Sequence, residues 1–122
     1  MKYQELIEND SALQLYQTKL LKTEWGFFNK VVNAILQISP DTTEILLHGS
    51  RAIGEHKRTS DWDFIAFVPT TEQRIEFSIK GSAFDKLHHV DRRKTDIQAE
   101  TIDSESMFVK IAREEGVVIW KA

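Results

Sequence analysis

Residues 48–64 read HGSRAIGEHKRTSDWDF, and the elements on either side of this stretch define the expected fold. The apolar run before it, Glu44 to His48 (EILLH), predicts a short buried strand. At its far end, Trp62 to Val68 (WDFIAFV) is the strongest strand pattern in the chain, and Pro69 closes it. Because both faces of this second strand are apolar beyond its first residues, we expect it to be covered on both sides.

Helical patterns surround these two strands. Residues 11–38 carry apolar side chains at helical spacing and stop before Pro40, and Gly26 suggests two helices or one helix with a wide buried face. The other expected elements are a short helix or turn at 51–54, a helix within the ambiguous segment 71–90, a strand at 95–99, a helix at 104–115 and a final strand at 117–120. Strands interleaved with helices predict an α/β (α+β) fold, a small mixed sheet flanked by helices. We expect one domain over 1–122, with a helical N-terminal segment (1–40) and a core at 44–120.

Composition excludes several classes of protein. The chain has 122 residues, 41% of them hydrophobic, which fits one globular domain with a real core. A net charge of −3 lacks the basic character of a dedicated nucleic-acid binder. There is no cysteine, no signal-peptide pattern in MKYQELIEND and no apolar run of membrane-spanning length. We therefore expect a cytoplasmic protein without a membrane partner.

Two aspartates at the start of the second strand carry the first chemical signal. On a strand Asp61 and Asp63 share one face, about 6.6 Å apart at a rise of about 3.3 Å per residue. Two carboxylates there repel each other and resist desolvation, so a cation is required. Mg²⁺ meets that requirement, because it favours carboxylates together with substrate phosphates. In the alternative interpretation, both aspartates face solvent beside Arg51, Lys57 or Arg58.

Two further features add to this signal. Gly49 and Ser50 end the preceding strand, where the N–H groups of a tight turn can approach a phosphate, although a plain strand-to-helix turn has the same pattern. Among later carboxylates Asp96 is the best candidate for a third ligand, with Asp91 and Glu100 as rivals. Three carboxylates can hold two Mg²⁺ ions about 3.5–4 Å apart, as in phosphoryl-transfer sites.

Gly49-Ser50, the later Asp61-Trp62-Asp63 and Asp96 on a strand together resemble the nucleotidyltransferase superfamily related to DNA polymerase beta. The stretch 48–64 and the ending 111–120 are similar to its minimal nucleotidyltransferase (MNT) branch. The resemblance covers about residues 44–120. It implies that Gly49 and Ser50 bind nucleotide phosphates and that Asp61, Asp63 and Asp96 are the catalytic Mg²⁺ ligands, Asp96 also serving as a base for the acceptor hydroxyl.

The resemblance also implies an activity and a partner. Such proteins move a nucleoside monophosphate, here AMP from ATP, onto an acceptor hydroxyl, with two Mg²⁺ ions as cofactors. Relatives act as antitoxins that pair with HEPN-type toxins, and some adenylylate a toxin tyrosine. Two alternatives stay open: a non-catalytic module that neutralises its partner by occlusion, and a transferase for a small molecule such as an aminoglycoside, built as a homo-oligomer. Nucleic acid is not expected as the substrate.

The sequence departs from the pattern of the MNT branch at residues expected to bind the triphosphate. Ile53 stands where many members of the branch have arginine, and the loop from Glu55 to Arg58 is the most variable part of that branch. Lys57 and Arg58 are the cations that can replace the arginine, although a solvated loop is the alternative interpretation. Neither departure touches the carboxylates.

Overall fold

The computed structural model describes residues 5–6, 13–83 and 87–122 and forms a mixed sheet between helices. The strands are β1 (Glu44–His48), β2 (Trp62–Val68), β3 (His89–Val90), β4 (Arg93–Thr101) and β5 (Val117–Lys121). The helices are α2 (Leu15–Thr23), α3 (Trp25–Ile38), α4 (Ser50–Ile53), α5 (Thr71–Ala83) and α6 (Met107–Glu115). Within the described parts of the chain, no helix is both long and apolar enough to cross a membrane.

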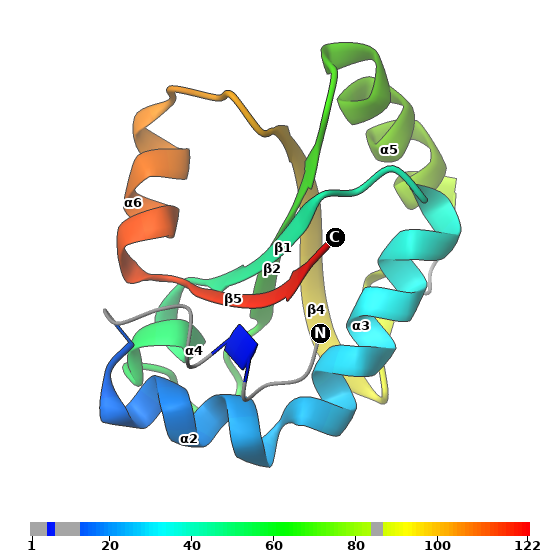
Figure 1. Ribbon diagram of the computed structural model, residues 1–122. Coiled ribbons are helices and arrows are strands. Elements are labelled where there is room, and N and C mark those ends of the chain that lie inside the picture. Colours follow the sequence, from blue (N-terminus) through cyan, green and yellow to red (C-terminus); the bar gives the residue numbers. More distant parts are fainter. Residues whose placement is uncertain (1–4, 7–12, 84–86) are drawn as a thin grey trace.

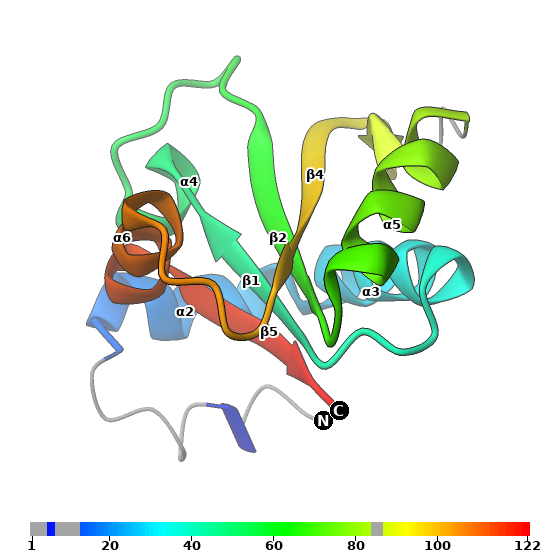
Figure 2. The ribbon, with the colours of Figure 1, turned by 90° about the horizontal axis from the view of Figure 1, so that it is seen from above.

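The strands lie in the order β3-β4-β2-β1-β5. β1 runs antiparallel to both β2 and β5, whereas β2 and β4 are parallel and are connected through α5. Seen from above, β4 lies between β2 and α5, and α6 lies on the opposite side of the sheet (Figure 2). The parallel pair is the feature that brings the beginning of β4 beside the beginning of β2.

Helices cover both faces of β2, as its sequence predicts (Figure 1). One face carries Trp62, Phe64, Ala66 and Val68 and packs into the larger core, which contains the buried side chains of α2 and α3. On the other face, Ile65 and Phe67 pack with Val109 and Ala112 of α6. Because α6 packs over β1 and β2, Asp96 and Gln98 on β4 remain exposed on that face.

The N-terminal apolar segment forms two helices, and the break lies at Glu24, not at Gly26. Glu24 ends α2 and precedes α3, while Gly26 lies inside α3. In α2 the backbone N–H of Gln14 donates to Oε1 of Gln17, which marks the first turn. Residues 7–12, where the expected helix begins, lie outside the described residues.

The ambiguous segment 71–90 contains the expected helix, α5, which continues through Gly81 to Ala83. Residues 84–86 lie outside the described part of the chain, and His89–Val90 form a short strand that the sequence pattern does not predict. β4 is longer than expected, and the expected helix at 104–115 begins at Met107. There Ser106 caps α6, because its hydroxyl accepts a hydrogen bond from the Val109 N–H.

Candidate active site

The strand register brings the predicted acidic residues to one row across the sheet. His48 on β1 is the partner of Asp63 on β2, and Asp63 is the partner of Asp96 on β4. Partners in a sheet point to the same face, so these three side chains lie together on the face that α6 partly covers. Asp61 precedes Asp63 by two residues and belongs to the same end of that face.

The neighbouring carboxylates affect the electrostatics of Asp63. Burial, followed by the negative charges of Asp96 and Asp61, raises the pKa of Asp63 to about 6. The neighbouring His48 has its pKa lowered by burial, although Asp96 opposes that shift. His48 packs edge-on against the Phe108 ring with their centroids 5.4 Å apart. An ionised Asp63 therefore has two negative neighbours and a neutral imidazole.

The turn between β1 and α4 lies directly against this carboxylate. Gly49 adopts a φ of 76°, in the left-handed region that favours glycine, and its carbonyl accepts from the Ala52 N–H at 3.0 Å. A Cβ placed on Gly49 would lie 2.5 Å from Oδ2 of Asp63, a distance that is too short for any side chain. Gly49 therefore allows the Ser50 turn and the Asp63 carboxylate to come close together.

Helix α2 supports this turn from behind. The Gln17 amide donates to the carbonyls of Ala52 (2.9 Å) and Glu115 (3.0 Å), and the Tyr16 hydroxyl donates to the carbonyl of Arg51 (3.0 Å). Gln17 is 5% exposed, so its two hydrogen bonds are shielded from water. The expected N-terminal helical segment thus packs against the sheet and also holds α4 in place.

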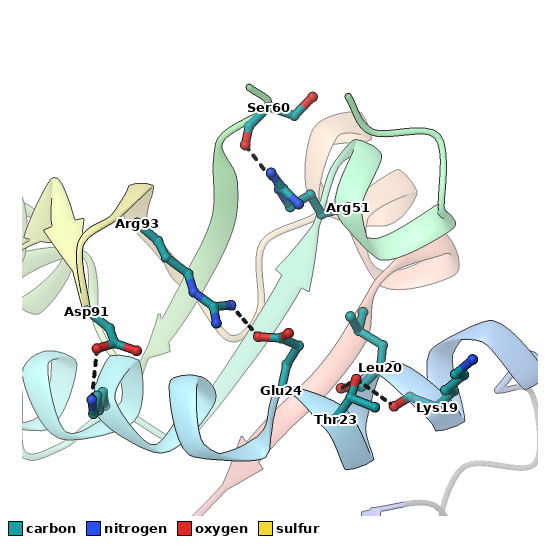
Figure 3. Close-up of polar contacts among 9 residues, drawn as sticks. Lys19, Leu20, Thr23, Glu24, Arg51, Ser60, Asp91 and Arg93 are labelled. Atoms are coloured by element: carbon teal, nitrogen blue, oxygen red, sulfur yellow. Dashed lines mark hydrogen bonds and ion pairs between the residues drawn. The ribbon is translucent and has the colours of Figure 1, made fainter. Parts of the chain in front are cut away.

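One cation near the aspartates was not predicted from the sequence. Nζ of Lys94 lies 3.6 Å from Oδ1 of Asp61, and in the described part of the chain no other cation comes within ion-pair distance of Asp61, Asp63 or Asp96. Arg51, considered above as a partner for the aspartates, instead donates from Nε to the Ser60 carbonyl at 3.0 Å (Figure 3). The alternation in Lys94-Thr95-Asp96 is the signal that places Lys94 on the face of Asp96.

The rivals of Asp96 are separated from the row. Asp91 lies in the turn between β3 and β4 and forms an ion pair of 2.8 Å with Lys30 of α3. Glu100 shares the face of Asp96 but pairs with Phe67, four residues further along β4 and hence about 13 Å away. Among the later acidic residues considered, only Asp96 stands opposite Asp63.

The carboxylates of Asp63 and Asp96 suit a divalent metal ion. Carboxylate oxygens are the ligands that Mg²⁺ prefers, and Asp63 lacks a compensating positive charge. Among the described residues, however, no three acidic or histidine side chains are placed closely enough to hold an ion by themselves. The carboxylates would therefore have to adjust around a metal, with phosphate oxygens and water completing its coordination. Asp61, Asp63 and Asp96 would hold it, beside Gly49 and Ser50.

Comparison with known proteins identifies the family of this chain. A family model described as a nucleotidyltransferase domain matches residues 28–119. The chain belongs to the nucleotidyltransferase domain family. The matched range begins in α3, includes β1 to β4 and ends within β5, so the resemblance inferred from the motifs is confirmed at the level of the superfamily. No protein with a curated description matches the sequence of this nucleotidyltransferase domain.

Solved structures of similar fold include a toxin–antitoxin with AMP-PNP, at 23% sequence identity and a TM-score of 0.50, covering 78% of this chain and 73% of that one. Another is a protein from Sulfolobus solfataricus described as a candidate nucleotidyltransferase, at 16% identity and a TM-score of 0.53, covering 92% and 93%. At these identities the similarity shows the fold alone. The mixed sheet of this nucleotidyltransferase domain is thus confirmed.

Proposed function

We propose that this chain is a Mg²⁺-dependent transferase that moves AMP from ATP onto a hydroxyl of a partner protein, as an MNT-type antitoxin acting on a HEPN-type toxin. The observation that carries the proposal is the row of Asp63 and Asp96, with Asp61 beside it and the Gly49 turn against it. The similar toxin–antitoxin structure with AMP-PNP, an ATP analogue, supports both the nucleotide and the kind of partner.

In the proposed reaction the acceptor oxygen forms a bond to the α-phosphorus, and the bond from that phosphorus to the bridging oxygen breaks. Pyrophosphate leaves with the electron pair, and Asp96 takes the proton of the acceptor hydroxyl. Gly49 and Ser50 would hold the phosphates, and Asp61 and Asp63 would hold the metal beside them. When bound, Mg²⁺ neutralises the phosphate charge and lowers the pKa of the acceptor hydroxyl.

The open face over β4 suits a large acceptor. Because α6 covers β1 and β2 but leaves Asp96 exposed, the acceptor hydroxyl can approach Asp96 from solvent without passing another element. On the other side of the row, the Phe108 ring of α6 packs against His48. A hydroxyl on another protein therefore reaches the site from the β4 side.

A labelling experiment with a purified HEPN-type toxin protein tests the proposal. ATP labelled at the α-phosphate should transfer its label to that protein in the presence of Mg²⁺, whereas ATP labelled at the γ-phosphate should not. The Asp61→Asn/Asp63→Asn variant should lose the transfer. As the control, Asp103→Asn/Glu105→Gln removes two carboxylates from the exposed loop between β4 and α6 and should retain it.

If the variant that lacks both aspartates still transfers label, the proposal is wrong. A different outcome would support occlusion. In that case neither wild type nor the double variant transfers label, yet both still suppress the partner in cells.

A further inference from the structure

A strongly basic pocket opens on the other side of Trp62 from the acidic row. It has a volume of about 480 Å³ and lies between the loop before β2, the start of β4 and the N-terminal end of α3. Five cations and one carboxylate line it: Arg51, Arg58, Arg92, Arg93, Lys94 and Glu24. The whole chain carries 16 Lys and Arg against 19 Asp and Glu, so the pocket concentrates positive charge in an acidic protein.

Two of these guanidinium groups form fixed walls of the pocket. Arg51 lies 4.5 Å from the centroid of the Trp62 ring while it bonds the loop carbonyls, and Arg93 forms an ion pair with Glu24 (Figure 3). Arg93 also stacks on Phe27, 4.3 Å from its centroid. Stacking and hydrogen bonding fix these groups, so little side-chain entropy remains to be lost when an anion binds.

The other cations lie around the mouth of the pocket. Arg58 and Arg92 are exposed, and Lys94 connects the pocket to the acidic row through Asp61. Arg92 has a φ of 63° and follows Asp91 at 53°, two left-handed residues in a turn that ordinarily takes Asn and Gly. An arginine therefore occupies a strained position at the mouth of the pocket, where glycine would suit the backbone better.

We propose that this pocket binds an acidic peptide segment next to the acceptor hydroxyl, an inference that rests on the proposed transfer to a protein. Guanidinium groups pair with carboxylates through two parallel hydrogen bonds, which orients a bound segment as well as attracting it. Lys94 borders both the pocket and Asp61, so a segment held in the pocket continues directly toward the transfer site.

A single-stranded nucleic acid fits the pocket less well. Base recognition needs an open aromatic face for stacking. Trp62 is the only aromatic residue that lines the pocket in the described chain; it is 8% exposed, and Arg51 covers its ring. The pocket therefore supplies charge pairing without a surface for bases.

Fluorescence anisotropy without nucleotide tests the proposal. The probe is a short labelled peptide in which glutamates flank one tyrosine. The control peptide has the same sequence with glutamine in place of each glutamate. The test variant is Arg58→Ala/Arg92→Gly, in which glycine suits the left-handed turn and preserves the fold. The control is Lys22→Ala/Lys110→Ala, which removes the same charge from exposed positions on α2 and α6.

Wild type and the control should bind the glutamate peptide about tenfold more tightly than the glutamine peptide, and the test variant should lose about tenfold in affinity. Equal binding of the two peptides, unchanged binding by the test variant, or tighter binding of a single-stranded RNA of the same length would overturn the proposal. So would a loss of Mg²⁺-ATP affinity in the test variant, which would assign the pocket to the triphosphate. Asp63→Asn leaves the pair of Lys94 and Asp61 in place, so it should lose transfer but bind the peptide as wild type does. Failure of the transfer and failure of this pocket are therefore distinguishable.

Discussion

Asp63 is the residue on which the site depends. It stands between His48 and Asp96 in the sheet, and burial with two neighbouring carboxylates raises its pKa to about 6. At neutral pH the folded, metal-free protein must therefore keep a charge in a place that disfavours it. A bound cation would offset this cost, which makes Asp63 a candidate metal ligand.

The first prediction concerns this cost. Since the pKa of Asp63 is raised on folding, the folded state holds its proton to higher pH than the unfolded state. The free energy of unfolding therefore falls as pH rises from about 4 to above 6, and the loss is complete above the folded pKa. We expect Asp63→Asn to stabilise the metal-free protein at pH 7.5 by about 1–2 kcal/mol, allowing for solvent screening, and to have little effect near pH 4.

Urea unfolding in EDTA at both pH values measures this difference, and Asp103→Asn, an exposed carboxylate, is the control. A destabilising effect of Asp63→Asn at pH 7.5 would contradict the account of its environment.

Gly49 provides the second prediction. We expect Gly49→Ala to cost about 1–3 kcal/mol of stability, because a side chain at a φ of 76° is strained and its Cβ displaces the Asp63 carboxylate. Nucleotide affinity should fall for the same reason. Combining it with Asp63→Ala should recover part of the stability but none of the affinity, which a double-mutant cycle by urea unfolding can measure. Strict additivity of the two changes would show that the contact is absent.

At the scale of elements, α2 acts as a support for the phosphate turn. α4 has only one turn, and its carbonyls at Arg51 and Ala52 accept from Tyr16 and Gln17 of α2. A helix this short does not hold its geometry by its own hydrogen bonds. The position of Ser50 is therefore set by a helix that lies far away in the sequence.

The third prediction tests this support. Gln17→Leu keeps the side-chain volume but leaves the buried carbonyl of Ala52 and the partly buried carbonyl of Glu115 without their donor. We expect a loss of about 2–4 kcal/mol in the free energy of unfolding, together with weaker nucleotide binding. Lys19→Ala, on the exposed face of the same helix, should change neither quantity. Normal nucleotide affinity in Gln17→Leu would mean that the position of α4 does not depend on its hydrogen bonds to α2.

At the scale of the whole molecule, local patterns predicted most elements, and long-range pairing decided the rest. The bounds of β1 and β2 were predicted correctly, because Gly49 and Pro69 mark where those strands end. The β3–β4 hairpin was missed, since its turn uses Asp91 and Arg92 in place of the Asn-Gly pair that signals such turns. Propensity alone does not reveal that substitution.

In the candidate site, too, local patterns predicted some features and long-range pairing decided others. The spacing of Asp61 and Asp63 follows from strand periodicity, but the position of Asp96 opposite Asp63 depends on the parallel pairing of β2 and β4. The basic pocket was missed because separate stretches of the chain, at residues 24, 51, 58–62 and 92–94, assemble it. A single sequence contains no local pattern that joins those segments.

Thermal unfolding with nucleotide tests the central claim most directly. Wild type and Asp61→Asn/Asp63→Asn are each heated with ATP, GTP, CTP or UTP, with and without Mg²⁺. A ligand at about a hundred times its dissociation constant adds about 2.7 kcal/mol to stability, which raises the midpoint by several degrees. We predict a rise for wild type that is largest with ATP, requires Mg²⁺ and is absent from the variant. An equal rise in the variant, or no rise with any nucleotide, would contradict the assignment of these aspartates to a metal–nucleotide site.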